Sequence, residues 1–243
     1  MYIDKRMIYI VMAIMLISGL AGYLTDTSRL LNLLLTVPGL LIAITFHEFA
    51  HAFAADKLGD DTPRLQGRLN LNPLSHLDPI GSLMMLFAGF GWGKPVEVNP
   101  RNYDRRFSMD KADAIVSIAG PLMNFFLAIV LTIIYGVIYK VASANFINSQ
   151  AGIIIMLMIN IAISLNIGLG IFNLIPLPPL DGSKIIKAFL PYNARAGFEK
   201  KKKIIEFLFV ILWIMVILSS IISPIIGVVY NALIKGMFAI FGI

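Results

Sequence analysis

The chain has 243 residues, of which 58% are hydrophobic and only 14% charged. Several apolar runs approach the roughly 20 residues needed to cross a bilayer, which excludes an ordinary soluble protein and predicts a polytopic helical membrane protein. Membrane topology explains the net charge of +6 better than a nucleic-acid partner does, so we expect no nucleic-acid binding. The absence of cysteine excludes disulfides, a thiol nucleophile and a cysteine-ligated metal.

Six apolar segments follow one another along the chain. The predicted spans cover residues 7–24, 30–55, 112–139, 151–175, 204–219 and 224–243. We therefore predict an all-α transmembrane helical bundle in which residues 1–243 form one domain, with its core over about residues 30–190 and C-terminal helices over about 204–243. Residues 1–21 also resemble a signal peptide, but the apolar run continues past the candidate cleavage site, which favours a first span.

A seventh apolar stretch, from Gly81 to Trp92, is too short to span a membrane and is interrupted by glycines. Backbone that is not helical is tolerated at membrane depth only where protein or water surrounds it. The stretch therefore predicts a short re-entrant loop that dips toward the interior of the bundle.

The basic residues alternate between the two sides of the predicted bundle. Lys5 and Arg6 precede the first span, eight Lys or Arg separate spans two and three, and seven separate spans four and five. The opposite side has little more than Arg29 and Lys140. The positive-inside rule then places the N-terminus and both basic connections in the cytoplasm of a multi-pass protein, which we expect in the cell membrane.

The second predicted span carries His47-Glu48-Phe49-Ala50-His51 near its cytoplasmic end. Two imidazoles four residues apart share one face of a helix and can both reach one zinc ion, while the intervening carboxylate can act as general base toward water. An ionisable cluster inside a membrane-length segment is costly and by default functional. The motif predicts a metallohydrolase in which His47 and His51 bind zinc and Glu48 is the catalytic base.

A third ligand is expected from the end of span four. The prolines between Asn173 and Gly182 cannot continue a helix, so the chain should unwind at the depth of the two histidines and bring Asp181 beside them. The competing carboxylates are Asp56, Asp78, Glu97 and Glu206, and Asp181 could instead cap a helix that begins near Ser183. Beside the paired histidines we favour ligation, which predicts one zinc per chain with an open coordination position.

Several motifs together resemble the site-2 protease family of intramembrane zinc metalloproteases, in its small form. The matching stretches are His47-Glu48-x-x-His51, Ala119-Gly120-Pro121-x-x-Asn124, Asn173-x-x-Pro176-x-Pro178-x-x-Asp181-Gly182, and the segments 72–81 and 91–100. The resemblance implies an endopeptidase that cleaves in or near transmembrane segments, with zinc on the two histidines and Asp181 and with Glu48 as the base. Glu97 stands where the family pattern suggests a second proline, which affects only the shape of that loop.

Two asparagines lie inside apolar spans, Asn124 in the third and Asn173 in the fourth. An amide without a partner there costs about 1–3 kcal/mol, so each needs a hydrogen-bond partner. A neighbouring helix is one candidate, since amide bonds between membrane helices are common. The backbone of a transmembrane protein substrate is the other, and we predict that both asparagines bind substrate.

Two other functions fit the same motif. A different membrane zincin, such as a prenyl-protein protease, would take its third ligand from a downstream glutamate. A non-catalytic zinc-binding scaffold would use the same ligands but would not need Glu48. Loss of hydrolysis on removal of Glu48, with zinc retained, distinguishes the protease from the scaffold.

Overall fold

The computed structural model describes residues 5–88, 91–214 and 217–242, and within these ranges the chain is helical without a named β-strand. The helices are α1 (Lys5–Thr25), α2 (Thr27–Lys57), α3 (Thr62–Leu65), α4 (Pro73–His76), α5 (Pro79–Ala88), η1 (Pro100–Asn102), α6 (Met109–Val141), α7 (Ala144–Ile147), α8 (Gln150–Asn173), α9 (Asp181–Phe189), α10 (Tyr192–Ile214) and α11 (Ile217–Phe241). The predicted all-α class is confirmed.

Four helices of the described chain are long and apolar enough to cross a membrane, namely α2, α6, α8 and the Ser220–Phe241 part of α11. They correspond to the second, third, fourth and last predicted spans. The remaining two of the six predicted spans are not confirmed. The first predicted span lies in α1, where the side chains of residues 7–12 are outside the described part of the chain and the described apolar stretch is Ala13–Tyr23. The fifth predicted span crosses residues 215–216, which lie outside the described residues.

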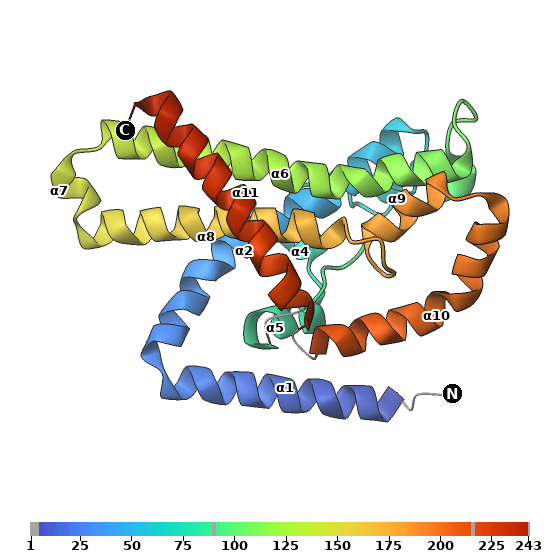
Figure 1. Ribbon diagram of the computed structural model, residues 1–243, viewed down its shortest axis with the longest axis horizontal. Helices are drawn as coiled ribbons and strands as arrows, with labels where there is room; N and C mark the ends of the chain where they lie inside the picture. Colours follow the sequence, from blue (N-terminus) through green and yellow to red (C-terminus); the bar gives the residue numbers. More distant parts are fainter. Residues whose placement is uncertain (1–4, 89–90, 215–216, 243) are drawn as a thin grey trace.

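The centre of the bundle is formed by α2, α6 and α8, which pack against one another. Figure 1 shows α6 and α8 running side by side along the length of the molecule. Small residues allow the close approach, because a Cβ atom at Gly39 of α2 would lie 2.9 Å from the Cα of Ala162 in α8. Close contact through small side chains is typical of helix packing in membranes.

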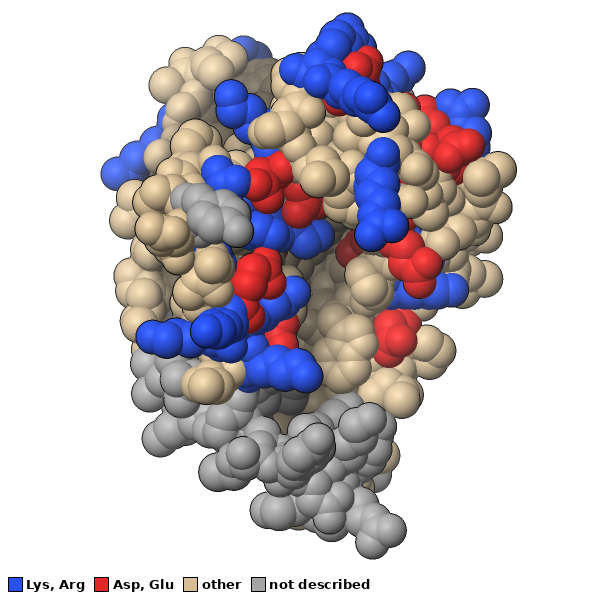
Figure 2. Space-filling view, turned by 90° about the vertical axis from the view of Figure 1, so that its right-hand side faces the viewer, with Lys and Arg blue, Asp and Glu red and all other residues tan. Residues whose placement is uncertain are grey.

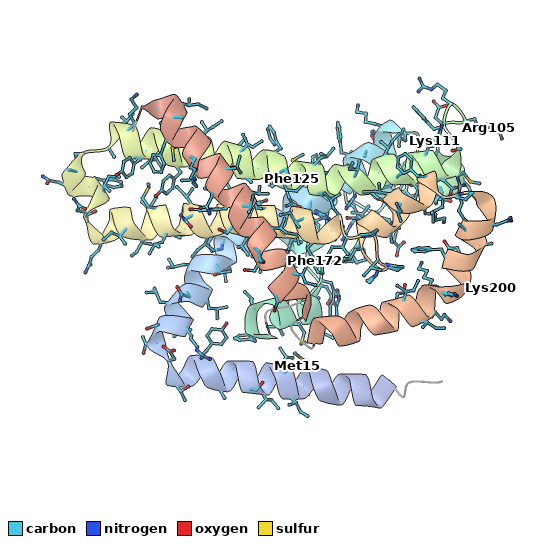
Figure 3. The ribbon with its side chains drawn as sticks, in the orientation of Figure 1. Met15, Arg105, Lys111, Phe125, Phe172 and Lys200 are labelled. Atoms are coloured by element: carbon cyan, nitrogen blue, oxygen red, sulfur yellow. The ribbon has the colours of Figure 1, made fainter. Side chains whose placement is uncertain are left out.

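The two ends of the bundle differ in charge. Lys140 near the end of α6 donates a hydrogen bond to the backbone oxygen of Phe241, so α6 and α11 finish at the same end (Figure 1). Basic and acidic side chains gather at the opposite end, which Figure 2 views directly. Arg105, Lys111 and Lys200 all lie there in Figure 3. That end also holds the start of α6, α9 and the first turns of α10.

The predicted loop over residues 81–92 is more regular than expected, because residues 79–88 form α5. Residues 91–99, here called the return segment, then run back past the start of α5, with Leu77 paired to Gly93 in an antiparallel bridge. A Cβ atom at Gly81 would overlap the backbone oxygen of Trp92, so glycine allows this approach. Residues 89–90 lie outside the described residues, and dipping into the bilayer stays a prediction.

Candidate metal centre and catalytic base

His47, His51 and Asp181, here called the metal triad, converge in the structure. The Nε2 atoms of His47 and His51 are 3.1 Å apart, and they lie 3.3 and 3.2 Å from Oδ2 of Asp181. These are the only three grouped side chains among the described residues that could hold a metal ion together. The spatial convergence expected from the sequence is therefore present.

The rival carboxylates that have described partners are used elsewhere. Asp56 forms an ion pair with Arg64, and Asp78 accepts a hydrogen bond from the backbone nitrogen of Gly81 at 2.7 Å. Glu97 accepts a hydrogen bond from Gln66. Within the described chain, no glutamate joins the two histidines.

Asp181 reaches the histidines because the chain leaves α8 through a proline-rich turn and starts α9 at Asp181 itself. Proline cannot continue a helix, so α8 ends before the turn. Gly182 packs directly against the turn, where a Cβ atom would overlap the backbone oxygens of Leu174 and Ile175. Ser183 closes the first turn of α9 by donating to the backbone oxygen of Leu180 at 2.6 Å. The turn thus fixes where Asp181 enters the bundle.

The dimensions of the metal triad fit zinc. Bonds of about 2.0–2.1 Å to a tetrahedral ion separate neighbouring ligand atoms by roughly 3.3 Å. The three separations in the structure are 3.1, 3.2 and 3.3 Å. A point about 2 Å from all three atoms therefore exists just outside their plane, and a fourth position is left for water or substrate.

The hydrogen bonds behind the histidines also favour a cation. His51 Nδ1 lies 2.8 Å from the backbone oxygen of Val116, and His47 Nδ1 lies 2.6 Å from Oδ1 of Asn124. Because a carbonyl oxygen only accepts, each Nδ1 carries a proton, and a neutral ring then turns a lone pair at Nε2 toward Asp181. With both rings neutral, three acceptor atoms face one another in a buried place, and a positive ion between them would supply the missing partner.

Glu48 lies one residue along α2 and is held from the other side. Its Oε2 accepts a hydrogen bond from the backbone nitrogen of Val96 in the return segment, at 3.0 Å. Gly93 passes close by, since a Cβ atom there would lie 3.6 Å from Oε1 of Glu48. The carboxylate is half-buried and keeps one oxygen without a hydrogen bond among the described residues.

The return segment is itself secured by Arg68, a residue that the sequence did not single out. The Arg68 side chain is 4% exposed, and its guanidinium donates to the backbone oxygens of Ser75 and Lys94. Burial lowers the pKa of Arg68, and the negative charges of Glu48 and Glu97 partly oppose that shift. A buried cation therefore joins the α4 turn to the segment that holds Glu48.

Gly120 of α6 faces the metal triad. A Cβ atom at this position would overlap Nε2 of His51 and would lie 2.7 Å from Cε1 of His47. Glycine is therefore required for α6 to pass this close to the two imidazole rings. The sequence indicated Gly120 only as part of the Ala119-Gly120-Pro121 motif.

The asparagines occupy different surroundings. Asn124 is fully buried, and its amide nitrogen donates to the backbone oxygen of Ala43 and to Oδ1 of Asn166. Asn173 is partly buried at the end of α8 and donates to the backbone oxygen of Leu169 at 3.0 Å. Sequence reasoning missed Asn166, although an amide in an apolar span was the signal that drew attention to the other two.

Comparison with known proteins places this site in a family. The family model described as Peptidase family M50 matches residues 137–217. "Putative zinc metalloprotease YwhC" of Bacillus subtilis (strain 168) is 38% identical over 208 residues, covering 83% of this chain and 90% of that protein. The chain belongs to the site-2 protease family. This protein is accordingly a zinc metalloprotease embedded in a membrane.

Further relatives of this site-2 protease family member carry similar names. "Putative zinc metalloprotease Rip2" of Mycolicibacterium smegmatis is 31% identical over 186 residues, covering 73% of this chain and 68% of the relative. "Zinc metalloprotease MJ0392" of Methanocaldococcus jannaschii is 28% identical over 165 residues, which is 68% of this chain and 36% of that protein. No solved structure gave a significant match.

Proposed function

We propose that this protease hydrolyses peptide bonds within or close to the transmembrane segments of other membrane proteins, as in regulated intramembrane proteolysis. The main support is the depth of the metal triad. His47 and His51 lie ten and six residues before Lys57, the last residue of α2, or about 15 and 9 Å along the helix axis. Since α2 is long and apolar enough to span the membrane, such a site meets chains that lie in or at the bilayer.

We assign one zinc ion per chain to the metal triad and the general base to Glu48. When bound, zinc supplies Lewis-acid polarisation of the scissile carbonyl and lowers the pKa of water. Glu48 accepts the proton of the attacking water and returns it to the leaving amine. The hydrogen bond from Val96 holds one carboxylate oxygen, so the other is left for this exchange.

A substrate helix must unwind before a peptide carbonyl is exposed, so the enzyme needs partners for an extended chain. The return segment lies beside Glu48, and Asn173 lies at the end of α8 where the chain turns toward Asp181. We therefore assign substrate contact to the return segment and Asn173. Substrate contact by Asn124 stays a prediction, and it would require Asn124 to exchange its present bonds.

We also propose that the protein lies in the cell membrane with its N-terminus and active site toward the cytoplasm. The charged end of the bundle supports this orientation, because basic residues favour the cytoplasmic side (Figure 2). A chain without native cysteine suits labelling of introduced thiols. Probes at Ser108 and Ala196 should be labelled from the cytoplasm and a probe at Ala144 from outside. Cytoplasmic labelling at Ala144 would reject this orientation.

The most direct test compares wild type with Glu48→Gln. Glutamine keeps the shape of the side chain and an acceptor for Val96, but it cannot take the proton of water. Proteolysis of a panel of membrane substrates should fall by about a hundredfold or more, with zinc content unchanged at one per chain. Wild-type proteolysis by the variant would reject Glu48 as the base.

The same experiment addresses the two alternative functions. A non-catalytic scaffold predicts zinc in both proteins and cleavage by neither. A prenyl-protein protease predicts cleavage of short prenylated peptides in preference to transmembrane segments. Zinc analysis of Asp181→Ala beside Glu206→Ala then separates the ligand sets, since only the first should lose the metal under our assignment.

A further inference from the structure

A line of hydrogen bonds runs across the three central helices to the outer face of His47. Asn166 of α8 accepts from the amide nitrogen of Asn124 in α6 at 3.0 Å, and Asn124 Oδ1 lies 2.6 Å from Nδ1 of His47 in α2. Both asparagines are fully buried and His47 is 5% exposed. The line thus links three helices far from water.

Two backbone oxygens, those of Ala162 and Ala43, fix the direction of every bond in this line. Asn166 Nδ2 lies 2.9 Å from the backbone oxygen of Ala162, which can only accept, so Asn166 must turn Oδ1 toward Asn124. Asn124 must then present its amide nitrogen to Asn166, and the same nitrogen also donates to the backbone oxygen of Ala43 at 3.1 Å. Oδ1 of Asn124 is left for His47, whose Nδ1 must carry the proton.

This fixed direction matters for the face of His47 that points into the site. With the proton on Nδ1, the lone pair of His47 is on Nε2, which lies 3.3 Å from Asp181 and 3.1 Å from His51. Without an acceptor at position 166, the amide of Asn124 loses one of the two described acceptors that set its orientation and keeps only the backbone oxygen of Ala43. A flipped amide would point a donor at Nδ1 and favour the proton on Nε2, where it blocks a metal.

We propose that Asn166 is a positioning residue for the metal triad: acting through Asn124, it holds His47 in the tautomer and orientation that bind zinc. The inference rests on the proposed ligand role of His47. Groups that orient a metal-binding histidine from behind commonly change metal affinity by about 10–100-fold when they are removed. Asn166 itself does not touch the metal triad among the described contacts.

The test measures zinc affinity by competition with a chelator in the full-length protein. Asn166→Leu keeps a similar volume but removes the acceptor, so zinc should bind about 10–100-fold more weakly. Asn160→Leu is the matched control, because Asn160 is an amide on the same helix that donates to Tyr230 of α11 instead. The zinc affinity of this control should stay within about twofold of wild type, because the described hydrogen bond of Asn160 does not lead to a residue of the metal triad.

Two further variants separate positioning from a general packing role. Asn166→Asp keeps an acceptor facing Asn124 and should restore most of the zinc affinity. Asn124→Leu should weaken binding, and adding Asn166→Leu to it should weaken it no further, because the effect of Asn166 passes through Asn124. If Asn166→Leu does not fold, Asn166→Ser provides the same test, since its hydroxyl is too short to reach Asn124.

A spectroscopic measurement reads the tautomer directly. The chain has three histidines, so nitrogen-15 labelling of histidine gives few signals, and His47→Ala identifies those of His47. Wild type should show His47 protonated at Nδ1, and Asn166→Leu a mixture of tautomers. Equal zinc affinity and an unchanged tautomer in Asn166→Leu would overturn the inference, whereas a wild type that binds no zinc would instead reject the proposed metal site.

Discussion

The two histidines proposed to bind zinc and the glutamate proposed as the base are neighbours on α2, yet they are held in different ways. The outer nitrogens of His47 and His51 contact Asn124 and the backbone of Val116, both in the long helix α6. Glu48 contacts Val96 in the return segment, which is not helical. One side of the helix therefore faces a buried helical partner, and the other faces a non-helical segment held by hydrogen bonds.

The difference suits the two tasks. Ligands of a catalytic metal keep one geometry, and helices packed in an apolar core provide that without water. A base must exchange a proton with substrate and needs a free oxygen, so support of one carboxylate oxygen from one side is compatible with its role. We call the metal triad with its contacts in α6 the metal half of the site, and Glu48 with the return segment the base half. Removing a support of the metal half should reduce zinc binding, whereas removing a support of the base half should reduce catalysis without loss of zinc.

The largest effect is expected from Gly120→Ala, which acts on the metal half. A methyl group there overlaps the His51 ring, so the imidazoles must move apart. Zinc content should fall to less than about a tenth and proteolysis by about a hundredfold or more. Gly227→Ala in α11 is the control, because nothing lies within 4 Å of its Cβ position. Full zinc occupancy in Gly120→Ala would contradict the described packing.

An intermediate effect is expected from Arg68→Ala, which acts on the base half. The backbone oxygens of Ser75 and Lys94 lose their donor, and the return segment that holds Glu48 loosens. We expect kcat to fall about tenfold or more while zinc content stays at the wild-type value. Arg68→Lys should recover only part of the loss, because an ammonium group lacks the planar fork of a guanidinium.

Arg64→Ala controls for loss of a nearby arginine. Arg64 is exposed and pairs with Asp56, which belongs neither to the metal triad nor to the return segment, so its removal should change kcat by less than about twofold. Loss of zinc together with activity in Arg68→Ala would show that the two halves of the site are not independent.

The smallest effect concerns Asp60, which follows α2 and joins it to the last residue of the return segment and to η1. Its buried carboxylate accepts from Thr62, from the backbone nitrogen of Asn99 at 2.6 Å and from Asn102 at 2.9 Å. Burial opposes ionisation, but these hydrogen bonds together hold the pKa of Asp60 below its usual value of 3.8. Asp60→Asn should cost about 1–3 kcal/mol of stability at pH 7, read as a lower unfolding temperature in detergent.

The free-energy cost of Asp60→Asn should become smaller as the pH falls. Because folding lowers the pKa of Asp60, the folded protein binds fewer protons than the unfolded chain, and the stabilisation is complete above the unfolded value and declines as pH falls through the folded one. The difference between wild type and Asp60→Asn should therefore shrink below about pH 4. A difference that grew in acid would reject this account.

Much of the site could be predicted from the sequence because it depends on local periodicity and on hydrophobic length. The spacing of His47, Glu48 and His51 is set by the helix, and the predicted spans 112–139 and 151–175 lie close to α6 and α8. The positions of the basic connections predicted alternating directions for the spans. This topology placed Asp181 at the same depth as the two histidines. None of these steps required knowledge of which helix faces touch.

Only the tertiary structure determined which residues contact the outer nitrogens of the two histidines and which hold the carboxylate of Glu48. A membrane helix such as α8 is apolar all round, so its hydrophobic pattern does not reveal which face meets α6, and the pairing of Asn166 with Asn124 cannot be read from it. Arg68 looked like one more cytoplasmic base until the fold buried it against the return segment. Such contacts join residues distant in sequence and depend on helix rotation, which only packing determines.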